Sequence, residues 1–314
     1  MSQLDPIFSR QFGWGDAIDP ATMATDPELA ERLLASYNDD EDYSPPLVDS
    51  TDAAIDGPLG IASLPVRIYN PEGAPDRAAL VWAHGGGFLG GSLEDQEADG
   101  VAREIAKHTG ATVVSVGYHL ADGTNSYPNL HREFAAATRW IMDTASTTGI
   151  DVSRIAVGGA SAGANLALGA VREMSDEGAP LPAKLVLVYP TLHATLPEGE
   201  NTAALPTTPA LLRIPPHLNA YMFANYIGPH VGAAPYASIE GADLSGLPTT
   251  LVIAAEYDDL RVSAELFVGD ARAQGVQVVE KPGLGGAHGF LAMSPAVAAT
   301  ERALADISEF VVSE

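Results

Sequence analysis

The sequence predicts an α/β fold in which a mostly parallel central sheet is flanked by helices and covered by a helical cap. Three observations support this prediction. Apolar runs of strand length alternate with helix-forming runs from about residue 60 to the end of the chain. One proline-rich segment, residues 191–246, interrupts the alternation. A Gly-Ala-Ser-Ala-Gly turn at residues 159–163 joins an apolar run directly to a helix-forming run.

The alternation divides the chain into four segments. Residues 1–55 contain one clear helix signal, Asp26-Pro27 followed by residues 28–37. We expect this segment to form N-terminal cap helices that pack over the body of the protein, with a mobile tail as the alternative. Residues 56–190 are expected to form the first part of an α/β core, residues 191–246 a cap insertion, and residues 247–314 the second part of the core.

The elements of the core follow in order along the chain. The expected strands are residues 64–70, 78–83, 111–117, 154–158, 185–190, 249–255 and 276–281, and the expected helices are residues 95–109, 131–145, 164–174, 263–274 and 296–311. Several of these strands are apolar throughout, which is typical of strands buried on both faces of a parallel sheet. Residues 218–227 form an amphipathic segment within the cap insertion.

Composition and charge exclude several classes of function. The 314 residues include 41 acidic and 16 basic ones, so the formal net charge is −25. A balance this acidic argues against a surface that binds nucleic acid or an anionic membrane. The acidic excess either keeps the surface soluble or reflects adaptation to high salt. The absence of cysteine excludes disulfides, thiolate zinc sites and a cysteine nucleophile.

Two further observations concern location and cofactors. No apolar run approaches the roughly 20 residues that span a bilayer, and the first residues lack the basic start and apolar core of a signal peptide. We therefore expect a soluble, cytoplasmic protein without a membrane or nucleic-acid partner. No lysine follows the consecutive glycines at residues 85–87 as a P-loop requires, so phosphate binding is disfavoured, and no cofactor or metal is expected.

The turn at residues 159–163 places Ser161 between a strand and a helix. Glycine two residues before and after the serine lets the backbones approach closely at a strained apex. The Ser161 hydroxyl would project from the carboxyl edge of the sheet. The amide of Ala162 and the positive end of the following helix would face an oxyanion that forms on an attacked carbonyl. The alternative is a tight glycine-rich crossover without a catalytic role.

A second glycine-rich stretch follows a buried strand. Three consecutive glycines, in His84-Gly85-Gly86-Gly87-Phe88, destabilise the end of a strand. The chemical reason to place them there is to leave backbone amides open to a ligand. The alternative is a flexible loop.

A serine nucleophile needs a histidine as general base and a carboxylate that orients the histidine. In this fold class the three residues follow one another as serine, acid and histidine. His288 is the only histidine beyond the last strand-ending carboxylates. Asp258 directly follows an apolar run and is favoured as the acid over its neighbour Asp259, which is well placed to cap or begin the next helix.

Four motifs in this order resemble the hormone-sensitive-lipase family of α/β-hydrolase esterases. They are His84-Gly85-Gly86-Gly87-Phe88, Gly159-Ala160-Ser161-Ala162-Gly163-Ala164-Asn165-Leu166, Ala255-Glu256-Tyr257-Asp258-Asp259-Leu260-Arg261 and His288-Gly289-Phe290. The resemblance covers roughly residues 60–314. It implies the α/β-hydrolase fold, a cap built from the N-terminal helices and the insertion, and short- to medium-chain acyl substrates. It also implies a triad of Ser161, Asp258 and His288, and an oxyanion hole made by the amides of Gly85, Gly86 and Ala162.

Several positions depart from the family pattern. Ala160 stands where the family usually has an acidic residue or threonine, Asp259 replaces a proline, and Val262 replaces an aspartate. Residues 117–122, Gly-Tyr-His-Leu-Ala-Asp, replace the usual Asp-Tyr-Arg-Leu-Ala-Pro, so a structural aspartate and arginine are absent. The triad stays intact, whereas the shape of the substrate pocket is not predicted.

We expect a serine carboxylesterase that hydrolyses small-molecule esters through an acyl-enzyme. One alternative is an amide, carbamate or other acyl hydrolase that uses the same triad, because protonation of an amine by His288 would allow cleavage of a C–N bond. The other is a non-catalytic binding protein, since some relatives keep the cap and pocket but have lost the histidine. Relatives are often dimers, so a homodimer is a further expectation of the resemblance.

Overall fold

An eight-stranded sheet forms the centre of the computed structural model, which describes residues 3–20, 22, 26–58, 63–71, 78–199 and 205–314. The strands lie in the order β1-β2-β4-β3-β5-β6-β7-β8. β1 pairs antiparallel with β2 and β2 with β4, while every other pair is parallel. The strands are β1 (Ser50–Ile55), β2 (Leu64–Tyr69), β3 (Ala79–Ala83), β4 (Thr112–Val116), β5 (Ile155–Ala160), β6 (Lys184–Val188), β7 (Thr249–Tyr257) and β8 (Val278–Ala287). The prediction of a mostly parallel sheet is confirmed.

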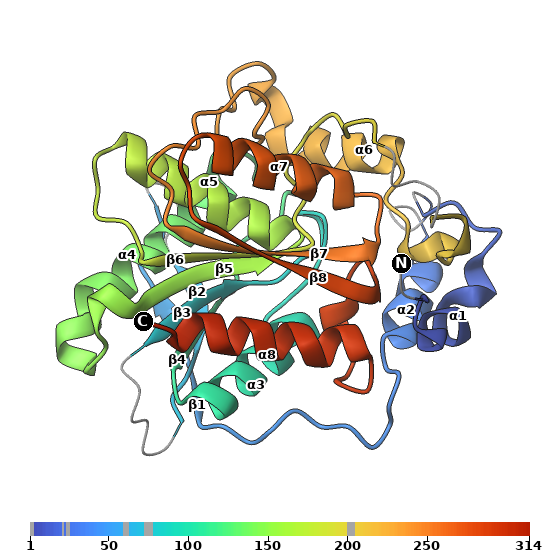
Figure 1. Cartoon of the computed structure of the whole chain (residues 1–314), viewed down its shortest axis with the longest axis horizontal. Helices are drawn as coiled ribbons and strands as arrows, with labels where there is room; N and C mark the ends of the chain where they lie inside the picture. Colours follow the sequence, from blue (N-terminus) through green and yellow to red (C-terminus); the bar gives the residue numbers. More distant parts are fainter. Residues whose placement is uncertain (1–2, 21, 23–25, 59–62, 72–77, 200–204) are drawn as a thin grey trace.

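Helices cover both faces of the sheet (Figure 1). On one face lie α3 (Val101–Thr109) and α8 (Ala298–Val312), and on the other lie α4 (Asn129–Thr148), α5 (Ala162–Asp176) and α7 (Arg261–Ala273). The apolar side chains of each face form a separate buried cluster with its own helices. This division explains the uniformly apolar central strands, because their side chains contribute to both clusters.

Additional elements gather near the carboxyl ends of the parallel strands (Figure 1). They are α1 (Pro6–Phe12), the 3₁₀ turn Gly13–Gly15 and α2 (Pro27–Ser36) from the N-terminal segment, and the 3₁₀ turns Leu205–Thr207, Ala210–Leu212 and Gly228–His230 with α6 (Pro216–Ile227) from the insertion. α1 contacts the turn Ala210–Leu212, so the two segments meet although some 200 residues separate them. That the two segments together form a cap stays a prediction.

The N-terminal segment holds more regular structure than its sequence indicated. The predicted helix is α2, where the Asp26 side chain accepts a hydrogen bond from the Leu29 amide. α1 was not predicted, yet Phe8 and Phe12 are fully buried against the core. Residues 50–55, which were included in the cap helices, form β1 instead and extend the sheet.

Two core elements also differ from expectation. The helix predicted over residues 95–109 begins with a π-helical turn, Gln96–Gly100, before α3. The last strand, predicted to end at residue 281, continues through the glycines to Ala287, so His288 lies directly after a strand and not within a loop. The register shift between β7 and β8 near Ala255 and Tyr257 accommodates this longer strand.

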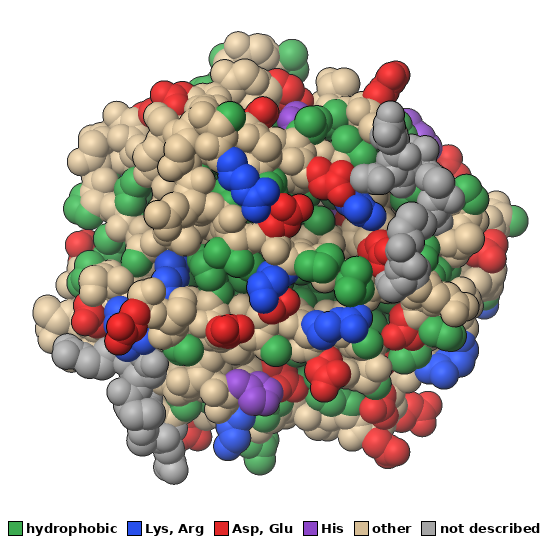
Figure 2. All heavy atoms as spheres, viewed as in Figure 1, with side chains coloured by type: hydrophobic (Ala, Val, Ile, Leu, Met, Phe, Trp, Pro, Cys, Tyr) green, Lys and Arg blue, Asp and Glu red, His purple; other side chains and the backbone are tan. Residues whose placement is uncertain are grey.

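The surface matches the acidic composition. Asp and Glu side chains are spread over the face shown in Figure 2, with Lys and Arg among them. Within the described residues, no helix is long and apolar enough to cross a membrane. The described chain also contains no group of three or more His, Asp or Glu side chains that could hold a metal ion.

Candidate active site

Ser161 stands at a strained turn between β5 and α5. Its backbone adopts φ 51° and ψ −114°, a region that residues with a side chain rarely occupy. The flanking glycines explain how the turn is possible. A Cβ on Gly163 would lie 2.2 Å from the carbonyl oxygen of Ala83, and one on Gly159 would lie 2.5 Å from the same oxygen. The motif therefore lets the elbow pack directly against the end of β3.

His288 connects Ser161 to Asp258. The His288 Nε2 lies 2.9 Å from the Ser161 Oγ, and the His288 Nδ1 lies 2.7 Å from the Asp258 Oδ2. The second carboxylate oxygen of Asp258 accepts a hydrogen bond from the Leu260 amide at 3.0 Å. Ser161 and Asp258 are both buried. The structure thus brings together the three predicted residues, from the ends of β5, β7 and β8.

The electrostatic surroundings favour protonation of His288. Burial lowers the pKa of this imidazole, but the charge and the hydrogen bond of Asp258 act in the opposite direction, with further contributions from the charges of Glu97 and Asp259. The net effect raises the pKa of His288 above its ordinary value of 6.5. The same negative charges that raise the pKa of His288 stabilise the imidazolium that forms when His288 takes the serine proton.

The glycine-rich stretch after β3 turns sharply beside the serine. Gly86 and Gly87 have positive φ values of 98° and 60°. A Cβ on Gly86 would lie 2.1 Å from the Gly90 carbonyl oxygen, so only glycine fits there. Among the described residues, the amides of Gly86 and Gly87 donate to no acceptor, and the amide of Ala162 is one of the free donors at the start of α5.

The Gly85 amide differs from the other predicted oxyanion donors. It donates to the Glu97 Oε2 at 2.5 Å, whereas the Gly85 carbonyl accepts hydrogen bonds from the Tyr118 hydroxyl at 2.8 Å and lies 2.9 Å from the His84 Nδ1. That carbonyl belongs to the same planar peptide as the Gly86 amide. Holding the oxygen therefore aims the Gly86 N–H in the opposite direction, away from His84 and Tyr118.

Three residues of this framework were not singled out from the sequence. Tyr118 lies in the stretch that departs from the family pattern, Glu97 in the predicted helix 95–109, and Tyr189 directly after β6. The Tyr189 hydroxyl donates to the Glu97 Oε1 at 2.6 Å, and its ring meets the His288 ring edge-on at 5.1 Å. Their side chains carry no sequence signal that separates them from ordinary surface or core residues.

Asp259 does not begin the next helix as expected. It forms two hydrogen bonds of 2.7 Å with the Arg213 guanidinium and accepts one from the Ile214 amide at 2.8 Å. The prediction of a capping role is therefore wrong. Asp259, which stands where the family has a proline, instead binds two residues of the insertion and so holds the insertion next to Asp258. At another departure, His119 places its Nδ1 2.9 Å from the buried Glu133 carboxylate.

The insertion also touches the glycine-rich stretch. Phe88 is fully buried and stacks on Tyr226 of α6 at 4.3 Å, with Phe223 edge-on at 5.7 Å. Met222 lies so close to Gly87 that a Cβ there would be 2.5 Å from its sulfur. A cavity of about 510 Å³ lies between the N-terminal segment and residues 206–215, and Arg213 lines it. None of Ser161, Asp258 and His288 lines that cavity.

Comparison with known proteins gives a consistent result. A family model described as alpha/beta hydrolase fold matches residues 80–292. The chain is 33% identical to the carboxylesterase NlhH of Mycobacterium tuberculosis, over 90% of this chain and 89% of that protein. It is 27% identical to the arylacetamide deacetylase of Bos taurus, over 73% of this chain and 72% of the relative. The crystal structure of an esterase from Pyrobaculum calidifontis superposes with a TM-score of 0.82 at 31% identity, covering 99% of this chain and 100% of that one.

Proposed function

Since this chain belongs to the hormone-sensitive-lipase family of α/β-hydrolase esterases and is a carboxylic ester hydrolase, we propose that it hydrolyses short- to medium-chain acyl esters with a triad of Ser161, His288 and Asp258. The observation that supports the triad most directly is the pair of contacts made by His288, 2.9 Å to the Ser161 Oγ and 2.7 Å to the Asp258 Oδ2.

The reaction we propose is a two-step acyl transfer. His288 takes the Ser161 proton as the serine oxygen attacks the ester carbonyl, and Asp258 stabilises the resulting imidazolium. The imidazolium then protonates the departing alkoxide, which leaves an acyl-enzyme. His288 next deprotonates a water molecule, which attacks the acyl carbon. The bond between that carbon and the Ser161 oxygen then breaks, the imidazolium returns its proton to the Ser161 oxygen, and the carboxylic acid leaves.

For the oxyanion we propose the amides of Gly86 and Ala162, with Gly87 as the further donor. We do not assign the Gly85 amide to the oxyanion hole, as the family resemblance implied, because this amide already donates to Glu97. Preorganised donors of this kind typically contribute about 10²–10³-fold to kcat each. The aromatic contacts of Phe88 with α6 hold this stretch against the insertion.

The test is hydrolysis of p-nitrophenyl esters from acetate to laurate by the wild type and by Ser161→Ala. We expect the highest kcat/KM with short chains and complete loss of covalent turnover in the variant. The matched control is Ser263→Ala, because Ser263 is also buried and lies 2.7 Å from the Nδ1 of His193. A fluorophosphonate should label Ser161 and not Ser263, as determined by peptide mass spectrometry. Wild-type rates in Ser161→Ala would end the proposal.

Amide hydrolysis by the same residues is the second candidate, and the similarity to an arylacetamide deacetylase favours testing it. The assay compares an aryl acetate with the corresponding arylacetamide. A kcat/KM for the amide equal to or above that for the ester would make amides the preferred substrates.

A further inference from the structure

Glu97 is a buried carboxylate that joins two parts of the active site. Its Oε2 accepts the hydrogen bond of the Gly85 amide and its Oε1 that of the Tyr189 hydroxyl, at 2.5 and 2.6 Å. Its own carbonyl oxygen accepts a hydrogen bond from the Trp82 indole at 2.8 Å. Gly85 follows β3 and Tyr189 follows β6, so a single side chain links the ends of two strands on either side of β5.

Each partner of Glu97 touches a different catalytic group. Gly85 immediately precedes the amide of Gly86, which we assign to the oxyanion. Tyr189 packs its ring edge-on against His288 and accepts a hydrogen bond from the Leu291 amide at 3.3 Å. The carboxylate therefore connects the oxyanion donors with the segment that carries the general base.

The chemistry of the link requires a carboxylate. Burying a charged group is costly unless hydrogen bonds satisfy it, and both oxygens of Glu97 accept one. Glutamine has the same shape but only one acceptor oxygen. Replacing Glu97 by glutamine would leave either the Gly85 amide or the Tyr189 hydroxyl facing an NH₂ group. The Tyr189 backbone, at φ 32°, adds a strained conformation that persists only when its surroundings hold it.

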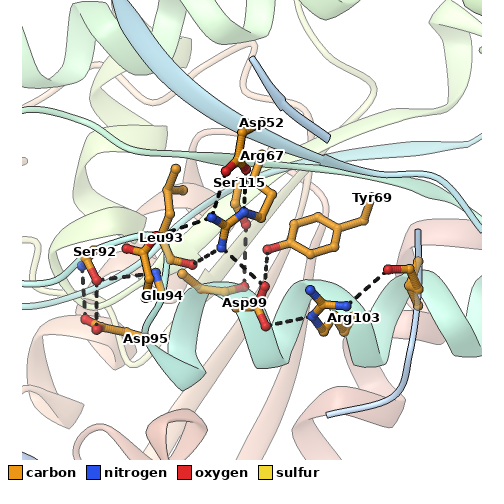
Figure 3. A network of polar contacts seen from close by, with 12 residues as sticks. Asp52, Arg67, Tyr69, Ser92, Leu93, Glu94, Asp95, Asp99, Arg103 and Ser115 are labelled. Carbon is orange, nitrogen blue, oxygen red and sulfur yellow. Dashed lines mark hydrogen bonds and ion pairs between the residues drawn. The ribbon is translucent and has the colours of Figure 1, made fainter. Parts of the chain in front are cut away.

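The segment that carries Glu97 is itself fixed to the sheet (Figure 3). Arg67 of β2 forms ion pairs with Asp52 of β1 at 2.6 Å and with Glu94 at 3.2 Å. Asp99 accepts hydrogen bonds from Tyr69 at 2.8 Å and from Arg103 at 2.7 Å. These contacts lie on both sides of residue 97 in the sequence and hold the π-helical turn in place.

We propose that Glu97 is a positioning residue for acyl transfer. Its carboxylate fixes the Gly85–Gly86 peptide directly and the His288 segment through Tyr189, so that both are held in place relative to Ser161. The inference rests on the proposed function, because it assigns a part to Glu97 in that reaction. Among the described residues, Glu97 hydrogen-bonds to none of Ser161, Asp258 and His288, so the part we assign to it is positioning.

The charge of Glu97 supplies an independent readout. The acidic groups that act on His288 are Asp258 and Asp259 after β7 and Glu97 from the π-helical turn, and the Tyr189 ring packs against the same imidazole. Glu97 is one of the charges that raise the pKa of His288. Removing it should move the acid limb of the kcat/KM profile to lower pH, which a purely structural residue would not do.

The experiment compares Glu97→Gln with Glu104→Gln. Glu104 is the matched control because it is also a buried carboxylate that accepts a tyrosine hydroxyl, from Tyr43 at 2.8 Å, two turns further along. We expect Glu97→Gln to lower kcat about 10- to 100-fold, somewhat less than the roughly 10²–10³-fold loss of an oxyanion donor. KM should change by less than about twofold, and the acid limb should shift downward. Glu104→Gln should keep the wild-type kcat and pH profile.

Tyr189→Phe is the second variant, because it removes the hydroxyl while keeping the ring against His288. It should lower kcat in the same direction with KM unchanged, and it decides the question if Glu97→Gln fails to fold. Wild-type kcat and an unshifted acid limb in Glu97→Gln would overturn the inference, as would equal losses in Glu104→Gln. Wild-type protein that neither hydrolyses esters nor reacts with a fluorophosphonate would instead overturn the proposed function.

Discussion

Two histidine–carboxylate pairs of this protein have similar geometry, but the pKa values of their histidines shift in opposite directions. In the candidate active site, His288 lies 2.7 Å from Asp258. Between α4 and α5, His131 lies 3.1 Å from Glu173. His288 has a raised pKa, while burial lowers the pKa of His131 and the charges of Arg132 and Arg172 add to that effect. A carboxylate at hydrogen-bond distance is thus not enough to make a histidine basic.

The difference lies in the other partners of each carboxylate. Glu173 also accepts the Arg132 guanidinium at 2.6 Å, and hydrogen bonds from His131 and Arg132 outweigh burial and lower its pKa to about 2. Asp258 accepts only a backbone amide besides the histidine, as far as the described residues show. The far nitrogens differ as well, since His288 faces a serine hydroxyl and His131 the Tyr226 hydroxyl. Arg132 thus supplies Glu173 with a charged partner besides the imidazole, whereas His288 is the one side chain that hydrogen-bonds to Asp258 among the described residues.

The largest expected effect comes from Asp258→Asn. The variant should lower kcat by about 10⁴-fold, because an amide stabilises the wrong histidine tautomer and cannot stabilise the imidazolium. Steady-state hydrolysis of p-nitrophenyl butyrate measures the loss. Thermal unfolding is the control that shows whether the variant is folded. A folded variant with a wild-type kcat would show that Asp258 does not orient or stabilise His288 during catalysis.

The corresponding change in the other pair, Glu173→Gln, should affect stability and not catalysis. It leaves the buried His131 and the half-exposed Arg132 without their ionic acceptor, which should cost about 1–3 kcal/mol of unfolding free energy. Urea denaturation gives the value, and kcat should stay within about twofold of the wild type. A catalytic loss as large as that of Asp258→Asn would erase the distinction between the two pairs.

The smallest expected effect concerns how the unfolding free energy depends on pH between about 5 and 7. His131 and His288 should contribute to it with opposite slopes. A histidine with a lowered folded pKa binds protons more readily when unfolded, so its contribution is lost as pH falls below the unfolded value of about 6.5. A histidine with a raised folded pKa contributes stability below about 6.5 that is lost as pH rises through the folded pKa.

Variants of the two histidines should therefore diverge. Compared with the wild type, His131→Gln should lose less unfolding free energy on acidification from pH 7 to pH 5, and His288→Gln should lose more. Urea denaturation at several pH values compares the three proteins, with pH 8 as the reference at which the charges of both imidazoles matter least. Parallel curves for the two variants would contradict the opposite pKa shifts.

The sequence was sufficient for the parallel part of the sheet and for the residues that meet at its carboxyl edge. Ser161 and Asp258 follow the ends of apolar runs, and His288 comes after the last expected strand, so the order of the three residues along the chain indicated that they meet at one edge of a parallel sheet. The parallel pairing of β3 and β5 likewise brings the glycine-rich stretch beside the serine.

The contacts of individual side chains were not predictable in the same way. Glu97 lies in a run that reads as an ordinary helix, and an acidic residue there is expected in solvent unless the tertiary structure supplies partners. Asp259 satisfied the local rules for a helix start, but a partner 46 residues earlier, Arg213, determines its position. β1 was missed because its pattern is weak: five of its six residues are at least partly exposed at an edge of the sheet.

The glycines of the elbow limit how this enzyme can be altered. A methyl group on Gly163 would lie 2.4 Å from the His84 carbonyl oxygen as well as against Ala83, so a side chain there would displace the nucleophile and the glycine-rich stretch together. Random mutagenesis should consequently yield few active variants at these positions. Libraries that aim at new substrates should diversify the insertion, where the Met222 side chain of α6 lies close to Gly87.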